Sequence, residues 1–288
     1  MILPTLAYAL VFGYLLMPGA YVALVDYKYA KGIFGSQFVG LRNFGFLLIN
    51  GDLWRITRNT VLYNLAFVLL GNLIQMAVAV MLSEVAGRAF KRSAQSIMLF
   101  PYFISYVIVG VFAFSMFNYD TGTVNGLLQF MGFEKHDFYS DPSIWKYIIF
   151  AFYIWKGTGY GVVVYLAAIL GINAEVVEAA HIDGANIFQR TRYLTLPSLK
   201  PTFAILLLFG LGGILNGQFD LFYNLIGTNS VLFPQTDIID TYVYRSLLGS
   251  FNFANSSAVG LYQSFFGLVV VLTVNYVVRR VNADYALF

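Results

Sequence analysis

Long uninterrupted apolar runs constrain this chain more than any other feature. A helix needs about 20 apolar residues to cross the hydrocarbon core of a bilayer, and the sequence offers six such runs. Charged residues make up only 11% of the chain, against about 25% in an ordinary water-soluble domain. The predicted fold is therefore an all-α membrane protein, a single transmembrane domain over residues 1–288 with six transmembrane helices. The predicted spans are 2–25, 61–83, 96–117, 144–171, 202–226 and 257–278.

The composition also excludes several functions. Without cysteine the chain can form no disulfide or thiolate metal site. Its two histidines, His136 and His181, are too far apart in sequence to indicate a histidine metal centre. We therefore expect no metal and no cofactor on this chain. The net charge of +3 comes from scattered basic residues, so we expect no nucleic-acid partner.

Enzyme motifs are absent from the sequence as well. No lysine is followed by Ser or Thr, so the chain lacks a phosphate-binding loop for ATP hydrolysis. Neither an HExxH nor a GxSxG motif occurs. We expect a protein that is not itself an enzyme.

The charges favour one orientation in the membrane. The first run has no charge before Asp26 and lacks the basic start of a secretory signal, which predicts a retained anchor and a longer native N-terminus. Taken together, the connectors at 84–95 and 172–201 are shorter than those on the opposite side, and they hold basic residues at higher density. The positive-inside rule then favours both termini in the cytoplasm.

The connector between the fourth and fifth runs has a helical pattern of its own. Asn173 is a suitable N-cap for a helix over 174–182. Gly184 can end that helix in the left-handed conformation. We expect a second helix to follow and to stop before Pro197 and Pro201. The result is a helical hairpin outside the bilayer.

Within this connector, "EAAHIDGANIFQRTRYLTLP" resembles the EAA loop of ABC importer permeases. That family pattern is Glu-Ala-Ala, three residues, Gly, nine residues, then Ile-x-Leu-Pro, and the only departure here is Leu194 in place of isoleucine. The resemblance implies the type I ABC importer permease fold, with a cytoplasmic coupling hairpin at 172–201 that docks on an ATP-hydrolysing subunit. The coupling residues it implies are Glu178, Ala179, Ala180, Asp183, Gly184, Leu194 and Pro197.

The resemblance covers nearly the whole chain. "FVGLRNF" (38–44), "FDLFYNL" (219–225) and "DIIDTYVYRSLL" (237–248) are similar to permeases of the carbohydrate class, especially those for complex oligosaccharides such as alginate. This implies import of a neutral or acidic oligosaccharide by alternating access across the bacterial cytoplasmic (inner) membrane. The implied partners are a second permease subunit, favoured as a different chain, two ATP-binding subunits that use MgATP, and an extracytoplasmic solute-binding protein.

Polar side chains within the spans are candidates for the substrate path, because they usually face the protein interior or a wet cavity. Aromatic faces can stack on sugar rings, and amides can serve hydroxyls as donor and acceptor. Lys156 can attract a uronate carboxylate, or it can instead pair with Asp220. The candidates are Trp155, Lys156, Tyr160, Asn216, Gln218, Asp220, Asn72, Gln75 and Gln263.

Two alternatives remain open from the sequence. One is a secondary transporter or channel driven by an ion gradient, supported best by Lys156 and Asp220 within the membrane. It gives no reason for the spacing of the EAA-like stretch. The other is an ABC permease for a substrate that is not a sugar, such as an amino acid, a peptide or phosphate.

Overall fold

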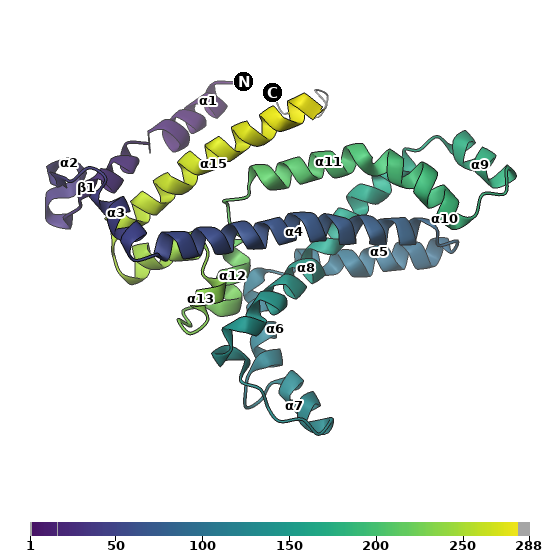
Figure 1. The fold of residues 1–288 in the computed structure, drawn as a ribbon, viewed down its shortest axis with the longest axis horizontal. Helices are drawn as coiled ribbons and strands as arrows, with labels where there is room; N and C mark the ends of the chain where they lie inside the picture. The colour runs from purple at the N-terminus through teal and green to yellow at the C-terminus, as the bar shows by residue number, and fades with distance from the viewer. Residues whose placement is uncertain (1, 16, 282–288) are drawn as a thin grey trace. The chain divides into compact units, whose positions relative to one another are not determined.

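The computed structural model describes residues 2–15 and 17–281, and within them the fold is almost entirely helical (Figure 1). The predicted all-α class is confirmed. The first half contains α1 (Leu3–Ala9), a π-helical turn (Leu10–Tyr14), a 3₁₀ helix (Met17–Leu24), β1 (Val25–Asp26), a 3₁₀ turn (Tyr29–Lys31), α2 (Gly32–Gly35), β2 (Gln37–Phe38), α3 (Arg42–Ile49), α4 (Asp52–Ser83), α5 (Arg88–Phe103), α6 (Tyr106–Phe117) and α7 (Thr123–Phe130). The second half contains a 3₁₀ turn (Phe138–Ser140), α8 (Pro142–Leu170), α9 (Ala174–Ile182), α10 (Ile187–Arg190), a π-helical turn (Thr191–Thr195), α11 (Leu196–Gly212), α12 (Phe219–Ile226), α13 (Phe233–Thr236), α14 (Ile239–Tyr244), a π-helical turn (Arg245–Gly249) and α15 (Phe253–Val281).

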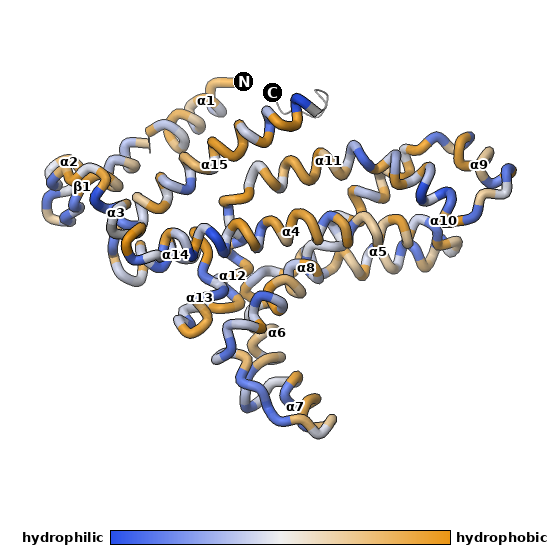
Figure 2. The backbone as a smooth tube through the Cα atoms, viewed as in Figure 1, coloured by the Kyte–Doolittle hydropathy of each residue, from blue (hydrophilic) through white to orange (hydrophobic). Residues whose placement is uncertain are grey.

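Five helical stretches of the described residues are long and apolar enough to cross a membrane, and α5 with α6 makes a sixth if the pair is one span. Apolar residues run along α4 and α11 in Figure 2. Only 11% to 39% of each apolar window is buried, as expected for surfaces that face lipid or a partner. The stretches are Leu3–Leu24, Asp52–Ser83, Pro142–Leu170, Ile187–Gly212 and Phe253–Arg280.

Two of the predicted spans do not correspond to single continuous helices. The third, 96–117, is not one continuous helix, because α5 and α6 meet at 96° around Ile104 and Ser105. The fifth, 202–226, is wrong at both ends, because the long helical stretch is Ile187–Gly212 and α12 is a separate helix. Average hydropathy along the sequence does not reveal either interruption, since the residues at both breaks are largely apolar or glycine.

The second interruption is possible because side chains satisfy the unwound backbone. The Gly217 N–H donates to the Asp240 carboxylate at 2.7 Å. The Gln263 amide donates to the carbonyl of Leu215 at 2.8 Å. Non-helical backbone is tolerated at membrane depth only where protein or water replaces the lost helical hydrogen bonds.

The prediction that the second hairpin helix stops before Pro197 and Pro201 is also wrong. The helix passes both prolines and continues to Gly212. A π-helical turn precedes Pro197, which then lies in the first turn of α11, where a missing N–H costs little. The Ser198 hydroxyl donates to the carbonyl of Leu194 at 2.8 Å, one turn back on the same helix.

Contacts divide the described residues into two units, each assembled from separate stretches of the chain. The first unit comprises those of Met1–Val61, Leu215–Phe219 and Asp237–Val269, and the second those of Leu62–Ile214, Asp220–Thr236 and Val270–Phe288. The first unit includes the short antiparallel pair of β1 and β2. Neither unit is continuous in sequence, and the single domain over 1–288 stays a prediction.

Helices α4, α8 and α11 form a core in the second unit. Its buried residues are Ala79, Val80, Leu82, Val162, Tyr165, Leu166 and Leu199. On α8, Gly159 allows α5 to approach closely, since an added Cβ would collide with the backbone carbonyl of Met98. This close packing holds α5 against α8.

Replacing Gly159 by Ala should force α5 and α8 apart and destabilise the protein by about 1–3 kcal/mol. The measurement is the midpoint of thermal unfolding in lipid nanodiscs. Gly157→Ala is the matched control on the same helix, because a Cβ there meets nothing within 4 Å. It should leave the midpoint unchanged or raise it slightly, since Ala favours helix over Gly. Equal midpoints for the two variants would contradict the close contact.

Candidate functional site

The connection between α8 and α11 is a hairpin that begins with α9 and α10. The Asn173 side chain accepts a hydrogen bond from the Glu175 N–H at 2.9 Å and starts α9 at the predicted position. Gly184 follows the helix with φ +76°, the left-handed conformation predicted for it. Asn186 and Gln189 then exchange hydrogen bonds in a capping box that starts α10.

The residues predicted for coupling lie on the surface of this hairpin. Large apolar side chains are exposed beside them: Ile182 is 86% exposed and Phe188 is 84% exposed. Exposed apolar side chains in such a membrane protein face lipid or a partner protein. Among the coupling residues, Glu178, Ala179, Asp183, Gly184 and Pro197 are exposed, while Ala180 and Leu194 are half-buried.

Arg190 ties the hairpin to the end of α4, and sequence reasoning missed this residue. Its guanidinium forms an ion pair with Glu84 at 2.8 Å and donates to the carbonyl of Ala185 at 3.0 Å. The two charged side chains are only 12% and 26% exposed, so water screens the pair less than it screens a surface pair. The partner is distant in sequence, and no local spacing indicates it.

A cavity of about 170 Å³ lies between α4, α8 and α11 in the second unit. It brings together three predicted path residues: Asn72 and Gln75 from α4, and Tyr160 from α8. Gly161 makes room for one of them, since a Cβ there would collide with the Gln75 side chain. The other lining residues are Phe67, Val68, Tyr153, Val164, Leu206 and Gly210.

The cavity combines ring faces with amides. The rings of Phe67 and Tyr153 stack with centroids 3.8 Å apart. The side-chain amide oxygen of Asn72 accepts a hydrogen bond from the Tyr165 hydroxyl at 3.2 Å. The Gln75 amide donates to a backbone carbonyl of α8 at 3.3 Å. Such a lining suits a ligand with many hydroxyl groups and apolar C–H faces.

Lys156 takes a different place from the one predicted. It does not line this cavity, and its ammonium donates to the carbonyls of Pro101, Tyr102 and Ile104 at the break between α5 and α6. The predicted rival, an ion pair with Asp220, is wrong, because no salt bridge joins these two residues in the described part of the chain. In this structure the Lys156 side chain therefore bonds the protein backbone and does not face the cavity.

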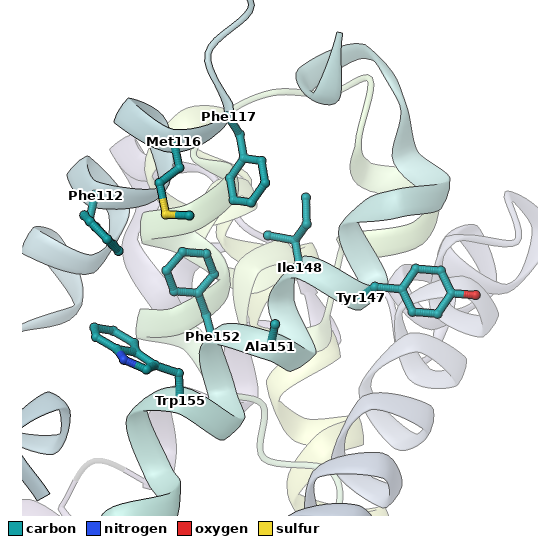
Figure 3. A pocket seen from close by; sticks show the side chains of 8 residues that line it. All are labelled: Phe112, Met116, Phe117, Tyr147, Ile148, Ala151, Phe152 and Trp155. Carbon is teal, nitrogen blue, oxygen red and sulfur yellow. The ribbon is translucent and has the colours of Figure 1, made fainter. Parts of the chain in front are cut away.

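Trp155 lies in a second, larger pocket of about 430 Å³ between α6 and α8 (Figure 3). Its ring packs edge-on against the ring of Phe152, with the two ring centroids 6.1 Å apart. The lining is almost wholly apolar, which suits an apolar surface better than sugar hydroxyls. The lining residues are Phe112, Met116, Phe117, Tyr147, Ile148, Ala151, Phe152 and Trp155.

The other predicted path residues lie outside the cavity. Asn216 and Asp220 are exposed and Gln218 is half-buried. Gln263 donates to the unwound backbone near Gly217, as described above. Their contact with a substrate stays a prediction. Within residues 2–15 and 17–281, no group of three His, Cys, Asp or Glu side chains is placed to hold a metal ion.

The start of α8 is fixed outside the membrane by Asp141. Its carboxylate accepts hydrogen bonds from the Ser143 hydroxyl at 2.6 Å and the Ser143 N–H at 2.9 Å. These hydrogen bonds lower the pKa of Asp141 below its ordinary value. The Asp141 carboxylate is therefore ionised at neutral pH, and its negative charge is stabilised at the N-terminus of α8.

Comparison with known proteins identifies the family. Residues 71–283 match the family of binding-protein-dependent transport system inner membrane components. The chain belongs to this family. The permease is thus a multi-pass component of the inner membrane, and its family is one of transport proteins.

Similarity to individual relatives extends over nearly the whole permease. Protein LplB of Bacillus subtilis is 34% identical over 99% of this chain and 89% of its own length. The polygalacturonan/rhamnogalacturonan transport system permease protein YteP of the same organism is 32% identical over 99% of this chain and 88% of its own.

Solved structures are similar over the same extent. A chain of a bacterial ABC transporter involved in the import of the acidic polysaccharide alginate is 31% identical, with a TM-score of 0.88 over 98% of this chain and 94% of that one. A chain of a bacterial alginate ABC transporter in complex with an alginate pentasaccharide-bound periplasmic protein gives 32% identity and a TM-score of 0.87 over 98% and 93%. The type I ABC permease fold is therefore confirmed.

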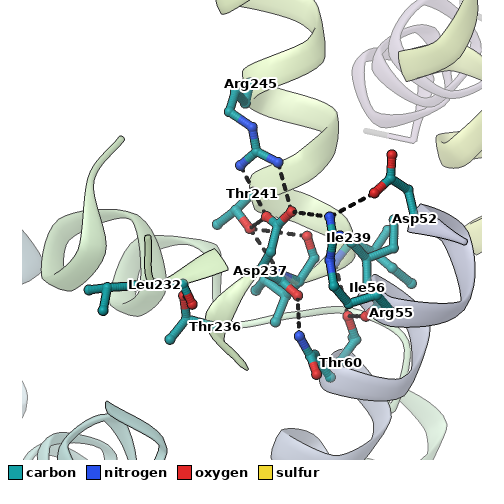
Figure 4. Close-up of polar contacts among 12 residues, drawn as sticks. Asp52, Arg55, Ile56, Thr60, Leu232, Thr236, Asp237, Ile239, Thr241 and Arg245 are labelled. Carbon is teal, nitrogen blue, oxygen red and sulfur yellow. Dashed lines mark hydrogen bonds and ion pairs between the residues drawn. The ribbon is translucent and has the colours of Figure 1, made fainter. Parts of the chain in front are cut away.

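A buried polar centre around Asp237 in the first unit of the permease was also missed from sequence (Figure 4). The Asp237 carboxylate, fully buried, accepts hydrogen bonds from Arg245 at 2.7 and 3.1 Å and from the Thr241 hydroxyl at 2.9 Å. Arg55 lies 3.8 Å away and pairs with Asp52 at 2.8 Å. The contact between Arg55 and Asp237 joins the start of α4 to the segment around α14, two parts of the chain that are far apart in sequence.

Loss of the Arg190 side chain should loosen the hairpin. In Arg190→Ala we expect hydrogen exchange of the amides in α9 and α10 to accelerate about fivefold, as the loss of a partly buried ion pair would allow. Hydrogen–deuterium exchange with mass spectrometry measures this. Arg192→Ala is the control, since Arg192 is exposed and lies over the ring of its neighbour Tyr193. Equal exchange in both variants would show that Arg190 does not hold the hairpin.

Arg245→Met should leave the buried carboxylate of Asp237 without its closest partner. We expect a loss of about 3–5 kcal/mol, nearer the lower end because Arg55 remains beside it. Thermal unfolding of the purified permease measures the loss. Arg58→Met, at an exposed position of the same unit, is the control. A loss no larger than in this control would argue against the centre.

Proposed function

We propose that this chain is the permease subunit of an ATP-driven, binding-protein-dependent importer that moves an oligosaccharide across the inner membrane by alternating access. The observation that carries the proposal is the similarity to the alginate transporter chain over 98% of the permease at a TM-score of 0.88. Polysaccharides also appear in the name of YteP and in the description of the alginate transporter, and they point to the same substrate class.

The cavity between α4, α8 and α11 supports a sugar on the path. The Tyr160 ring offers a face for a sugar ring, and Asn72 and Gln75 offer amide donors and acceptors for hydroxyls. At about 170 Å³ the cavity is smaller than the usual 300–1,000 Å³ of a small-molecule site. It would therefore admit part of one sugar at a time, and it would widen in the transport cycle or in the assembled complex.

The hairpin supports coupling to a separate ATPase. The chain has no phosphate-binding loop, so MgATP would bind and be hydrolysed in the partner subunits. The exposed side chains of Ile182 and Phe188 would enter a cleft of that partner, with Glu178 and the small Ala179 beside them. Gly184 sets the angle between α9 and α10, so a movement of the partner would be passed to α8 and α11.

The complete importer would contain four kinds of subunit. Beside this permease stand a second permease, favoured as a different chain, and two ATP-binding subunits on the hairpin. An extracytoplasmic solute-binding protein delivers the sugar to the opposite side of the membrane. The hairpin and both termini would then lie in the cytoplasm, in agreement with the higher density of basic residues in the inner connectors.

The alternative of an ion-gradient-driven transporter loses its best support. It rested on Lys156 and Asp220 as intramembrane ion sites. The Lys156 ammonium is bonded to backbone carbonyls instead, and the alternative pair with Asp220 is not formed in the described residues. The hairpin has no role in that mechanism.

The decisive experiment measures ATP hydrolysis by the reconstituted importer with its binding protein, across a panel of neutral and uronic oligosaccharides. We expect one sugar class to stimulate hydrolysis. Gly184→Val should reduce this stimulation about tenfold or more, because a β-branched residue is strained at φ +76°. Gly184→Asn is the matched control, since Asn tolerates the left-handed conformation. It should retain stimulation.

Two results would overturn the proposal. One is uptake that follows an ion gradient and continues without ATP. The other is stimulation by a solute that is not a sugar, with no response to any saccharide in the panel. Full activity of Gly184→Val would reject the hairpin as the coupling element and leave the substrate class intact.

A further inference from the structure

The break between α5 and α6 interrupts the helical hydrogen bonding of the backbone, and the Pro101 carbonyl keeps one backbone donor there, the Ile104 N–H at 3.2 Å. α5 ends at Phe103 and α6 begins at Tyr106, with their axes at 96°. The last carbonyls of any helix lack intrahelical donors. Within a bilayer each carbonyl left unsatisfied costs several kcal/mol, so a donor from elsewhere in the protein is required.

The ammonium of Lys156 supplies that donor. It donates to the carbonyl oxygens of Tyr102 at 2.8 Å and Pro101 at 3.2 Å, and also to that of Ile104. It also lies over the ring of Tyr106, the first residue of α6, at 4.7 Å from the centroid. A lysine ammonium has no further N–H to offer once three carbonyls are bound. A cation at this position also complements the negative end of the α5 dipole.

Lys156 is thus not free to meet a substrate. Its side chain is buried, with 7% of the residue exposed. One turn along the same face of α8, Gly159 packs directly on the backbone of α5 at Met98. The two contacts attach α8 to α5 and to the break at adjacent turns.

This attachment lies on a continuous line of contacts in the second unit. α8 leads through Asn173 into the hairpin. At the other end, α6 touches α12, since a Cβ at Gly110 would collide with the carbonyl of Asn224. The break lies between these two ends, and a flexible break would absorb any movement that α8 transmits.

We propose that Lys156 is a positioning residue for transport, one that clamps the break between α5 and α6 so that α6 moves together with α8. Movement of the hairpin then reaches α6, and through α6 the segment that carries Asp220 and Asn224. The part of this inference that concerns ATP rests on the proposed function. The clamp itself does not.

Spin-label distances test the clamp directly. The chain has no cysteine, so Val111→Cys on α6 and Leu170→Cys at the end of α8 give a unique labelled pair. Both positions are exposed, at 67% and 84%. In the complete transporter in lipid, we expect one narrow distance between the labels, the same in the resting and the vanadate-trapped state.

Variants at Lys156 separate the charge from the packing. Lys156→Met keeps the length of the side chain without donors, and the distance between the labels should broaden in the resting state. Transport per ATP should fall about tenfold while basal hydrolysis continues. Lys156→Arg keeps charge and donors and should restore the narrow distance. Lys146→Met, at an exposed site of α8, is the control and should behave as the unsubstituted protein. If the Met variant does not assemble, Lys156→Gln replaces it under the same criteria.

A narrow, unchanged distance in the Lys156→Met transporter would overturn the proposal. So would a change in the apparent affinity for sugar alone, because that result would make Lys156 a substrate contact. The resting-state distance does not depend on ATP. Failure of the proposed function would therefore appear in the hydrolysis measurements and leave the test of the clamp readable.

Discussion

Backbone hydrogen bonding inside the bilayer governs the arrangement of this permease. Hydrocarbon offers no partner to an N–H or a carbonyl, so a span can be interrupted only where protein groups or water replace the helical bonds. In the part of the chain that the structure describes, two of the predicted spans are interrupted. Lys156 bonds the carbonyls at the first break, while Asp240 and Gln263 hold the backbone of the second. The costly polar side chains of the spans therefore act largely on the protein's own backbone.

The arrangement also depends on close approach of the helices, and glycine residues allow it. Gly159 brings α8 onto α5, and Gly110 brings α6 onto α12, in each case where a Cβ would strike backbone. Gly161 has a different neighbour, the side chain of Gln75 in the cavity. Close packing and satisfied breaks belong together, because a donor such as the Lys156 ammonium reaches a carbonyl on another helix only when the two helices are in contact.

Local rules explain which parts of the structure the sequence could predict. The cap at Asn173, the helix that follows it and the left-handed Gly184 depend on neighbouring residues, and all three were predicted. The fifth span was misplaced because hydropathy averages over the glycine-rich break near Gly217. Long-range partners were missed for a similar reason: neither the Arg190–Glu84 pair nor the contact of Arg55 with Asp237 has a spacing that a local pattern can reveal.

The cavity shows how these constraints bear on transport. Its amides are already engaged: Asn72 donates to Val68 on its own helix and accepts from Tyr165, and Gln75 donates across to α8. Under the proposed function, a sugar entering there would exchange one hydrogen bond for another, so the net gain per bond would be small. The aromatic faces would then supply most of the attraction, without fixing the orientation of each hydroxyl. A path that holds its substrate weakly can also release it, as conduction through a membrane requires.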